Sequence, residues 1–95
     1  MDIEFRDPML ALVETGRAAE TRLPISVINS LRQKLVIIRA APDERTLRNW
    51  KSLHYEKMEK EERSIRLNKQ FRLIFTLNTG CKPNKMTILR VWNHD

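Results

Sequence analysis

Residues 63–77, RSIRLNKQFRLIFTL, decide the fold, because the spacing of apolar residues changes here from a helical period to a period of two. Apolar and polar residues alternate over 64–68, and over 71–77 every second residue is apolar, with Arg72, Ile74 and Thr76 on the opposite face. This is typical of strands that rest one face on a core. The short polar segment between them predicts a tight hairpin. A loop over 78–85 and a last strand over 87–92 complete a predicted three-stranded meander.

Helical signals occupy the first half of the chain. Residues 3–5 alternate and predict a short first strand, and Asp7 followed by Pro8 predicts a helix start. A second helix is expected from Pro24 to Ala41, and a short third helix from Pro42 to Trp50. The apolar residues of the second helix recur at helical spacing. They are Ile28, Leu31, Leu35 and Ile38.

This order of elements predicts one α+β domain over residues 1–95, with the N-terminal helices packed on one face of a small twisted, mainly antiparallel sheet. In the last strand, Leu89 and Val91 are expected to face the core and Ile88 to face away, although a single β-bulge would invert that parity. The face without helices would then carry three cations and one aromatic side chain, a lining suited to RNA phosphates and unstacked bases. These residues are Arg66, Arg72, Arg90 and Trp92.

The net charge of +6 is placed unevenly along the chain. Residues 1–47 carry seven basic and seven acidic side chains, whereas residues 48–95 carry eleven basic and five acidic ones. Concentrated positive charge on a small domain raises its affinity for phosphate groups, which favours a polyanion site. A solvated surface that aids solubility has the same composition, so charge alone leaves both interpretations open.

Signals for export or membrane insertion are absent from the sequence. Cys81 is the only cysteine, so an internal disulfide cannot form. The longest aliphatic run, residues 35–38, is far too short to span a bilayer, and the first residues lack a cationic segment followed by an apolar one. We therefore expect a cytoplasmic protein that does not associate with membranes.

Few kinds of catalytic site are compatible with the residues that the chain offers. His54 and His94 lie forty residues apart, without further ligands at suitable spacing, so no metal site is predicted. Only two glycines are present, which excludes a glycine-rich phosphate loop. What remains is a set of cationic or titratable side chains. They are His54, Lys57, Arg66, Arg72, Arg90 and His94.

These residue types suit cleavage of RNA, which carries its own nucleophile. The 2′-hydroxyl attacks the adjacent phosphodiester once a base removes its proton and an acid protonates the leaving 5′-oxygen. Two imidazoles can serve as base and acid, while lysine and arginine hold the developing charge, so neither metal nor cofactor is needed. Taken singly, each of these residues is also compatible with an ordinary solvated or capping role.

Two stretches of the chain carry a resemblance to a known family. Residues 50–57, WKSLHYEK, and 64–75, SIRLNKQFRLIF, resemble the HigB-type plasmid-maintenance killer toxins of the RelE/ParE superfamily. The pattern in these toxins is Leu-His, a lysine three residues on, and then Ser-Ile-Arg-x-Asn-x-x-aromatic-Arg-aliphatic-x-Phe. The upstream helix over 32–41 is also similar, and the likeness spans nearly the whole chain.

The resemblance implies a RelE-like fold and a toxin of a type II toxin–antitoxin system. Such a toxin is a ribosome-dependent mRNA endoribonuclease, or mRNA interferase, that inhibits translation. It also implies a HigA-like helix-turn-helix antitoxin as partner, besides the ribosome and mRNA, and contact with operator DNA through the antitoxin complex. By position, the catalytic residues would be His54, Lys57, Arg66 and His94. Contacts to RNA would come from Lys69, Arg72, Arg90, Trp92 and Asn93.

At four places the chain departs from the family pattern. The family commonly ends Asp-Tyr-His, whereas residues 92–94 here are Trp-Asn-His. Tyr55 stands where proline is common, Met58 where glycine is common, and Arg63 where tryptophan usually precedes Ser-Ile. Because the altered end lacks a carboxylate and a phenol, the sequence leaves open which histidine is the base and which the acid.

Two other classes of function remain open at this stage. A non-catalytic, ParE-like relative would share the architecture but act by binding a protein target, and it should tolerate loss of both histidines. A plain nucleic-acid-binding protein would act with an antitoxin at a promoter. Cleavage of translated RNA distinguishes the mRNA interferase from both.

Overall fold

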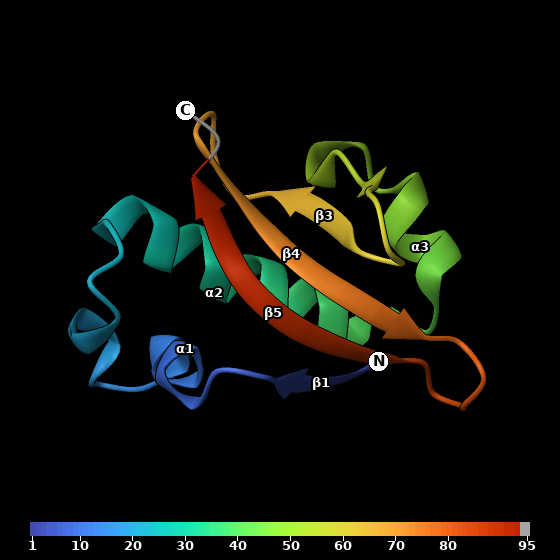
Figure 1. Cartoon of the computed structure of the whole chain (residues 1–95), viewed down its shortest axis with the longest axis horizontal. Helices are drawn as coiled ribbons and strands as arrows, with labels where there is room; N and C mark the ends of the chain where they lie inside the picture. Colours follow the sequence, from blue (N-terminus) through green and yellow to red (C-terminus); the bar gives the residue numbers. More distant parts are fainter. Residues whose placement is uncertain (94–95) are drawn as a thin grey trace.

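The computed structural model describes residues 1–93, which form a sheet with helices on one side (Figure 1). His94 and Asp95 lie outside the described residues. The strands are β1 (Asp2–Phe5), β2 (Glu56–Lys57), β3 (Arg63–Arg66), β4 (Phe71–Asn78) and β5 (Lys85–Asn93). The α-helices are α1 (Pro8–Ala11), α2 (Ile25–Ala40) and α3 (Glu44–Asn49), and short 3₁₀ turns are η1 (Leu12–Glu14), η2 (Ala18–Thr21) and η3 (Lys51–Leu53).

Within residues 1–93 the sheet has five strands in the order β1-β5-β4-β3-β2. The antiparallel meander β3-β4-β5 confirms the sequence prediction, with β5 longer than the expected 87–92. β1 pairs parallel with β5, and β2 pairs antiparallel with β3. β2 was not predicted, because an alternation cannot be recognised in two residues.

Helix α2 provides the apolar surface on which the sheet rests. It lies behind β4 and β5 in Figure 1 and runs from Ile25 to Ala40, close to the expected bounds. The predicted stripe is confirmed, since its four members and Val27 are all buried. They form one core with residues from β3, β4 and β5, including Ile65 and Phe75. The helices therefore cover one face of the sheet, as expected for a two-layer α+β fold.

The predicted parity of β5 is wrong in the middle of the strand. Ile74 lies opposite Arg90, but the next residue, Phe75, lies opposite Ile88, so Leu89 is an extra residue in β5. Such a β-bulge reverses the direction of side chains on one side of it. Ile88 consequently belongs to the core under the helices, while Leu89 is buried outside that core.

Beyond the bulge the prediction is correct, because Val91 packs against the core and the residues beside it face away. The second face of the sheet is not uniformly open, however. Ile74 shares that face with its register partner Arg90, yet its side chain is fully buried. Solvent access on this face therefore varies from residue to residue, since Arg90 opposite Ile74 is exposed.

The ends of the helices are stabilised by local and tertiary hydrogen bonds. The Asp7 carboxylate accepts from Met9 N–H at 2.9 Å, which confirms the predicted start of α1. At the other end of α2, the ammonium of Met1 donates to the carbonyls of Ile38, Arg39 and Ala41. A positive group is favourable there because unpaired carbonyls collect at a helix C-terminus. None of the helices in residues 1–93 has the length and apolar character required to cross a membrane.

The burial of α2 gives a test of the fold. Leu35→Ala removes a fully buried side chain and should lower the free energy of unfolding by about 2–5 kcal/mol, as measured by urea denaturation. The neighbouring Val36 is 67% exposed, so Val36→Ala is the matched control and should change stability by less than about 0.5 kcal/mol. Equal effects of the two substitutions would contradict the assigned face of α2.

Candidate active site

The register of the sheet brings three of the expected site residues side by side. Arg66 in β3 lies directly opposite Arg72 in β4, and Arg72 lies opposite Trp92 in β5. Opposed residues on neighbouring strands point to the same face. We call Arg66, Arg72 and Trp92 the cationic row. It crosses the sheet on the face opposite α2, with Trp92 44% exposed.

The two arginines of the row differ in their surroundings. The side chain of Arg72 is only 11% exposed. Its Nε donates to Ser64 Oγ at 2.9 Å, and its Nη2 donates to the His54 carbonyl at 2.6 Å and lies 3.8 Å from Glu56 Oε2. Arg66 is partly exposed and donates from Nε to the Asn68 carbonyl at 3.3 Å. Arg72 is therefore held by three polar contacts, whereas Arg66 makes a single, longer hydrogen bond within the described residues.

The backbone of His54 is fixed in an uncommon conformation. Its φ and ψ are 48° and 53°, in the left-handed region, where it ends the η3 turn and donates from N–H to the Lys51 carbonyl at 3.2 Å. The residue before it, Leu53, is fully buried, and the residue after it, Tyr55, packs against the core. The His54 side chain is exposed. A solvent-accessible imidazole is thus carried by a backbone that is anchored on both sides.

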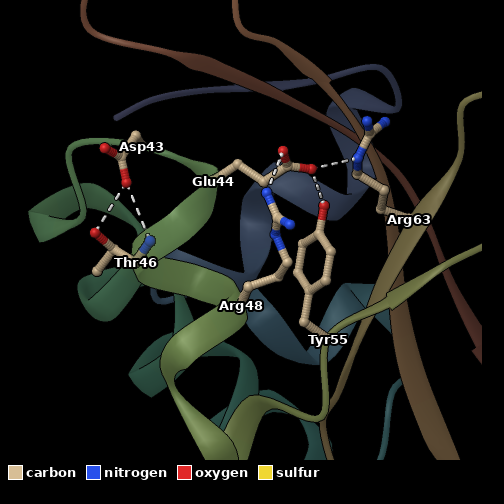
Figure 2. A network of polar contacts seen from close by, with 6 residues as sticks. All are labelled: Asp43, Glu44, Thr46, Arg48, Tyr55 and Arg63. Atoms are coloured by element: carbon tan, nitrogen blue, oxygen red, sulfur yellow. Dashed lines mark hydrogen bonds and ion pairs between the residues drawn. The ribbon is translucent and has the colours of Figure 1, made fainter.

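A partly buried carboxylate anchors the segment that follows His54 (Figure 2). The hydroxyl of Tyr55 and the Nε of Arg63 both donate to Oε2 of Glu44, at 2.5 and 2.9 Å. The side chains of Glu44 and Arg63 are only 15% and 13% exposed. We call Glu44, Tyr55 and Arg63 the Glu44 network. It joins the start of α3 to β3 and to the residue after His54.

The network perturbs the ionisation of its members. The hydrogen bond from Tyr55, followed by that from Arg63, holds the pKa of Glu44 below its usual value. Burial, together with the adjacent Glu44 carboxylate, raises the pKa of the Tyr55 hydroxyl far above its usual range. The network is therefore maintained at neutral pH with an ionised carboxylate and a neutral phenol.

Sequence reasoning did not find the Glu44 network, although it found two of its members. Tyr55 and Arg63 were noted only as departures from the family pattern, and the structure shows both on one carboxylate. They lie 11 and 19 residues from Glu44 in the sequence, so no local spacing connects them. The signal available in the sequence was that both departures from the family pattern, Tyr55 and Arg63, introduce hydrogen-bond donors, for which Glu44 offers an acceptor.

The hairpin between β3 and β4 explains why the family pattern contains an asparagine at position 68. Asn68 Oδ1 accepts hydrogen bonds from the backbone N–H groups of Gln70 and Phe71, each at 2.8 Å, and so closes the predicted turn. Lys69 is exposed in this turn. Asn93, the last residue of β5, is exposed and lies opposite Phe71. One end of the sheet therefore gathers the hairpin and the end of β5 beside the cationic row (Figure 1).

The register does not bring every expected residue to this row. Lys57 is exposed but lies opposite Arg63, which places it on the helix side of the sheet. Arg90 is on the face of the row but two residues before Trp92 in β5, where its Nη2 contacts Glu62 Oε1 at 2.8 Å. His94 directly follows Asn93 in sequence and lies outside the described residues.

Comparisons with known proteins agree with this architecture and assign the family. Over 100% of both chains, the fold resembles a YoeB/ParE toxin from Agrobacterium tumefaciens with a TM-score of 0.56; at 8% identity this supports a RelE-like fold alone. Toxin HigB-1 of Vibrio cholerae serotype O1 is 36% identical over 94 residues, which cover 90% of this chain and 99% of that protein. A family model described as "RelE-like toxin of type II toxin-antitoxin system HigB" matches residues 3–87.

The chain therefore belongs to the HigB-like family of RelE-type toxins. It is the toxin of a type II toxin–antitoxin system, and its biological partner is a cognate antitoxin.

The Glu44 network makes a prediction about stability and pH. Because the folded-state pKa of Glu44 is depressed, its ionised form stabilises the protein above its usual pKa of 4.5, and this contribution is lost as the pH falls through the lower folded value. Glu44→Gln should lower the free energy of unfolding by about 1–2 kcal/mol at pH 7. The difference from wild type should shrink below about pH 4.5.

The measurement is urea denaturation of both proteins from pH 7 to pH 3. Glu20→Gln is the matched control, because the Glu20 side chain is 45% exposed and pairs with Arg17 at the surface. A stability difference between wild type and Glu44→Gln that stays constant over the whole pH range would contradict the depressed pKa.

Proposed function

We propose that this toxin is a ribosome-dependent endoribonuclease that cleaves mRNA through the 2′-hydroxyl and so inhibits translation. The observation that carries the proposal is the cationic row, together with the bond from Arg72 to the His54 carbonyl. These contacts join the backbone of His54, whose side chain is exposed, to the row of guanidinium groups and indole on the sheet face without helices, which supports a site shared by these groups. A metal-independent phosphodiester cleavage needs these kinds of group.

The charge arrangement in the row supports an anionic ligand. Arg66 and Arg72 are directly opposed, and like charges in this position destabilise a sheet unless a counter-charge is near. Glu56 partly compensates Arg72 at 3.8 Å. Binding of an RNA phosphate by Arg66 would relieve the remaining repulsion, in the two-pronged geometry that arginine provides. Trp92 is positioned to stack on an unpaired base.

Of His54 and His94, one acts as the general base and the other as the general acid. Arg66 stabilises the charge that develops on the phosphorane, and Lys57, which the register puts on the helix side of the edge strand β2, adds positive charge from around that edge. Lys69, Arg90 and Asn93 contact the RNA backbone on either side of the cleaved bond.

The proposed partners follow from family membership and charge. We propose that the cognate antitoxin is a HigA-like helix-turn-helix protein and that the complex of the two contacts operator DNA. The eleven basic residues of the second half of the chain suit the phosphates of ribosomal RNA and mRNA. The toxin would then act in the cytoplasm, where mRNA is translated.

Substitution of the histidines tests the mechanism. General acid–base catalysis contributes about 10²–10⁴-fold, so His54→Ala should slow cleavage by that factor, roughly 3–5 kcal/mol of barrier. His94→Ala should have a similar effect. The measurement is the rate of cleavage of an mRNA bound to ribosomes, with cut positions mapped in cells after a short induction of the toxin.

The double variant, His54→Ala with His94→Ala, is the control that separates the classes of function. An mRNA interferase should make no cuts in this form and should no longer arrest growth. A toxin that acts by binding a protein target would arrest growth with both histidines removed. Near wild-type cleavage by His54→Ala would remove His54 from the mechanism.

A further inference from the structure

The bonds around Arg72 separate its role from that of Arg66. Its Nε is occupied by Ser64 Oγ and its Nη2 by the His54 carbonyl, and its side chain is 11% exposed. Ser64 is itself fully buried. An RNA phosphate would have to displace these partners to take the two-pronged grip of the Nε–Nη2 edge of Arg72. Arg72 is therefore poorly placed as a direct RNA ligand, in contrast to the expectation from sequence.

The acceptor of the Arg72 bond is the peptide group of the candidate catalytic histidine. A residue other than glycine is rarely found in the left-handed region and persists there only where its surroundings determine the conformation. For His54 those surroundings are the η3 turn before it, the Glu44 network after it, and Arg72 on its carbonyl. Of these, Arg72 is itself a member of the cationic row and bonds directly to the His54 carbonyl.

We propose that Arg72 is a positioning residue, which fixes the His54 peptide in its left-handed conformation and so sets where the imidazole stands relative to Arg66. The expected effect on RNA cleavage rests on the proposed function. The expected effect on the His54 backbone rests on the geometry alone. Because Arg72 bridges Ser64 in β3 and His54 at the end of η3, it links the position of the imidazole to the sheet. Displacement of a catalytic group by about 1 Å can cost on the order of 10²-fold in rate.

The test compares Arg72→Lys and Arg72→Gln in cleavage of ribosome-bound mRNA. Lysine keeps the charge but cannot reproduce the two directed bonds of arginine. A positioning role predicts that both variants slow cleavage about 10- to 100-fold at saturating ribosome concentration, with ribosome affinity and its salt dependence unchanged. A direct phosphate contact predicts that Arg72→Gln weakens affinity and reduces the salt slope by about one, while Arg72→Lys retains binding. That second pattern would overturn the proposal.

A spectroscopic measurement on the isolated toxin tests the structural part. The backbone Cα and amide resonances of His54 should move away from left-handed values in both Arg72 variants, and its amide should exchange faster with solvent. Ser64→Ala removes only the second partner of Arg72 and should produce a smaller change in the same direction, which guards against a failure of the Arg72 variants to fold. Arg17→Gln is the matched control, since Arg17 is an exposed arginine paired only with Glu20. Unchanged His54 resonances in the Arg72 variants would refute the positioning role.

The two experiments fail in different ways. If the wild-type toxin does not cleave translated mRNA, the proposed function is wrong, but the His54 resonances still report whether Arg72 holds the peptide. If wild type cleaves and the Arg72 variants cleave equally fast, the proposed function stands and the positioning role is wrong.

Discussion

The packing of α2 against the sheet is the contact on which the rest of the molecule depends. It buries one face of β3, β4 and β5 and leaves the other without helices, so polar and charged side chains can occupy that second face. The bulge at Leu89 adjusts this arrangement within β5. It keeps Ile88 in the core while Val91, two residues past the bulge, still faces inward, and Trp92 thereby joins the outer row.

The candidate site is assembled by tertiary polar contacts rather than by any local motif. Arg72 reaches from β4 to the carbonyl of His54, and Glu44 reaches from α3 to the residue that follows it. Between these two contacts the backbone is constrained while the imidazole remains accessible. Supporting contacts of this kind let a fold hold a reactive group in one geometry before any ligand arrives.

The elements with strong local signals could be predicted from the sequence. The alternation over 71–77, the helical spacing that begins at Ile28, and the cap at Asp7 each reflect interactions within a few residues. The features that were missed depend on distant partners. The bulge at Leu89 arises from pairing with β4, and β2 exists because β3 offers it an edge.

In the candidate site, too, the features with a local sequence signal could be predicted and the contacts between distant residues could not. The sequence placed Arg66, Arg72 and Trp92 on one face, because the strand parity was read correctly in β3, in β4 and in the part of β5 that follows the bulge. It could not show that Arg72 is occupied by His54 and Ser64, or that Lys57 lies on the side of Arg63.

Among related toxins, the Glu44 network should leave an evolutionary trace. A change of Tyr55 to proline alone removes a donor from a partly buried carboxylate, and loss of Arg63 alone leaves it only the more exposed cation of Arg48 among the described residues. The residues at positions 44, 55 and 63 should therefore be inherited together. Related toxins that carry only part of the Glu44 network should be rare.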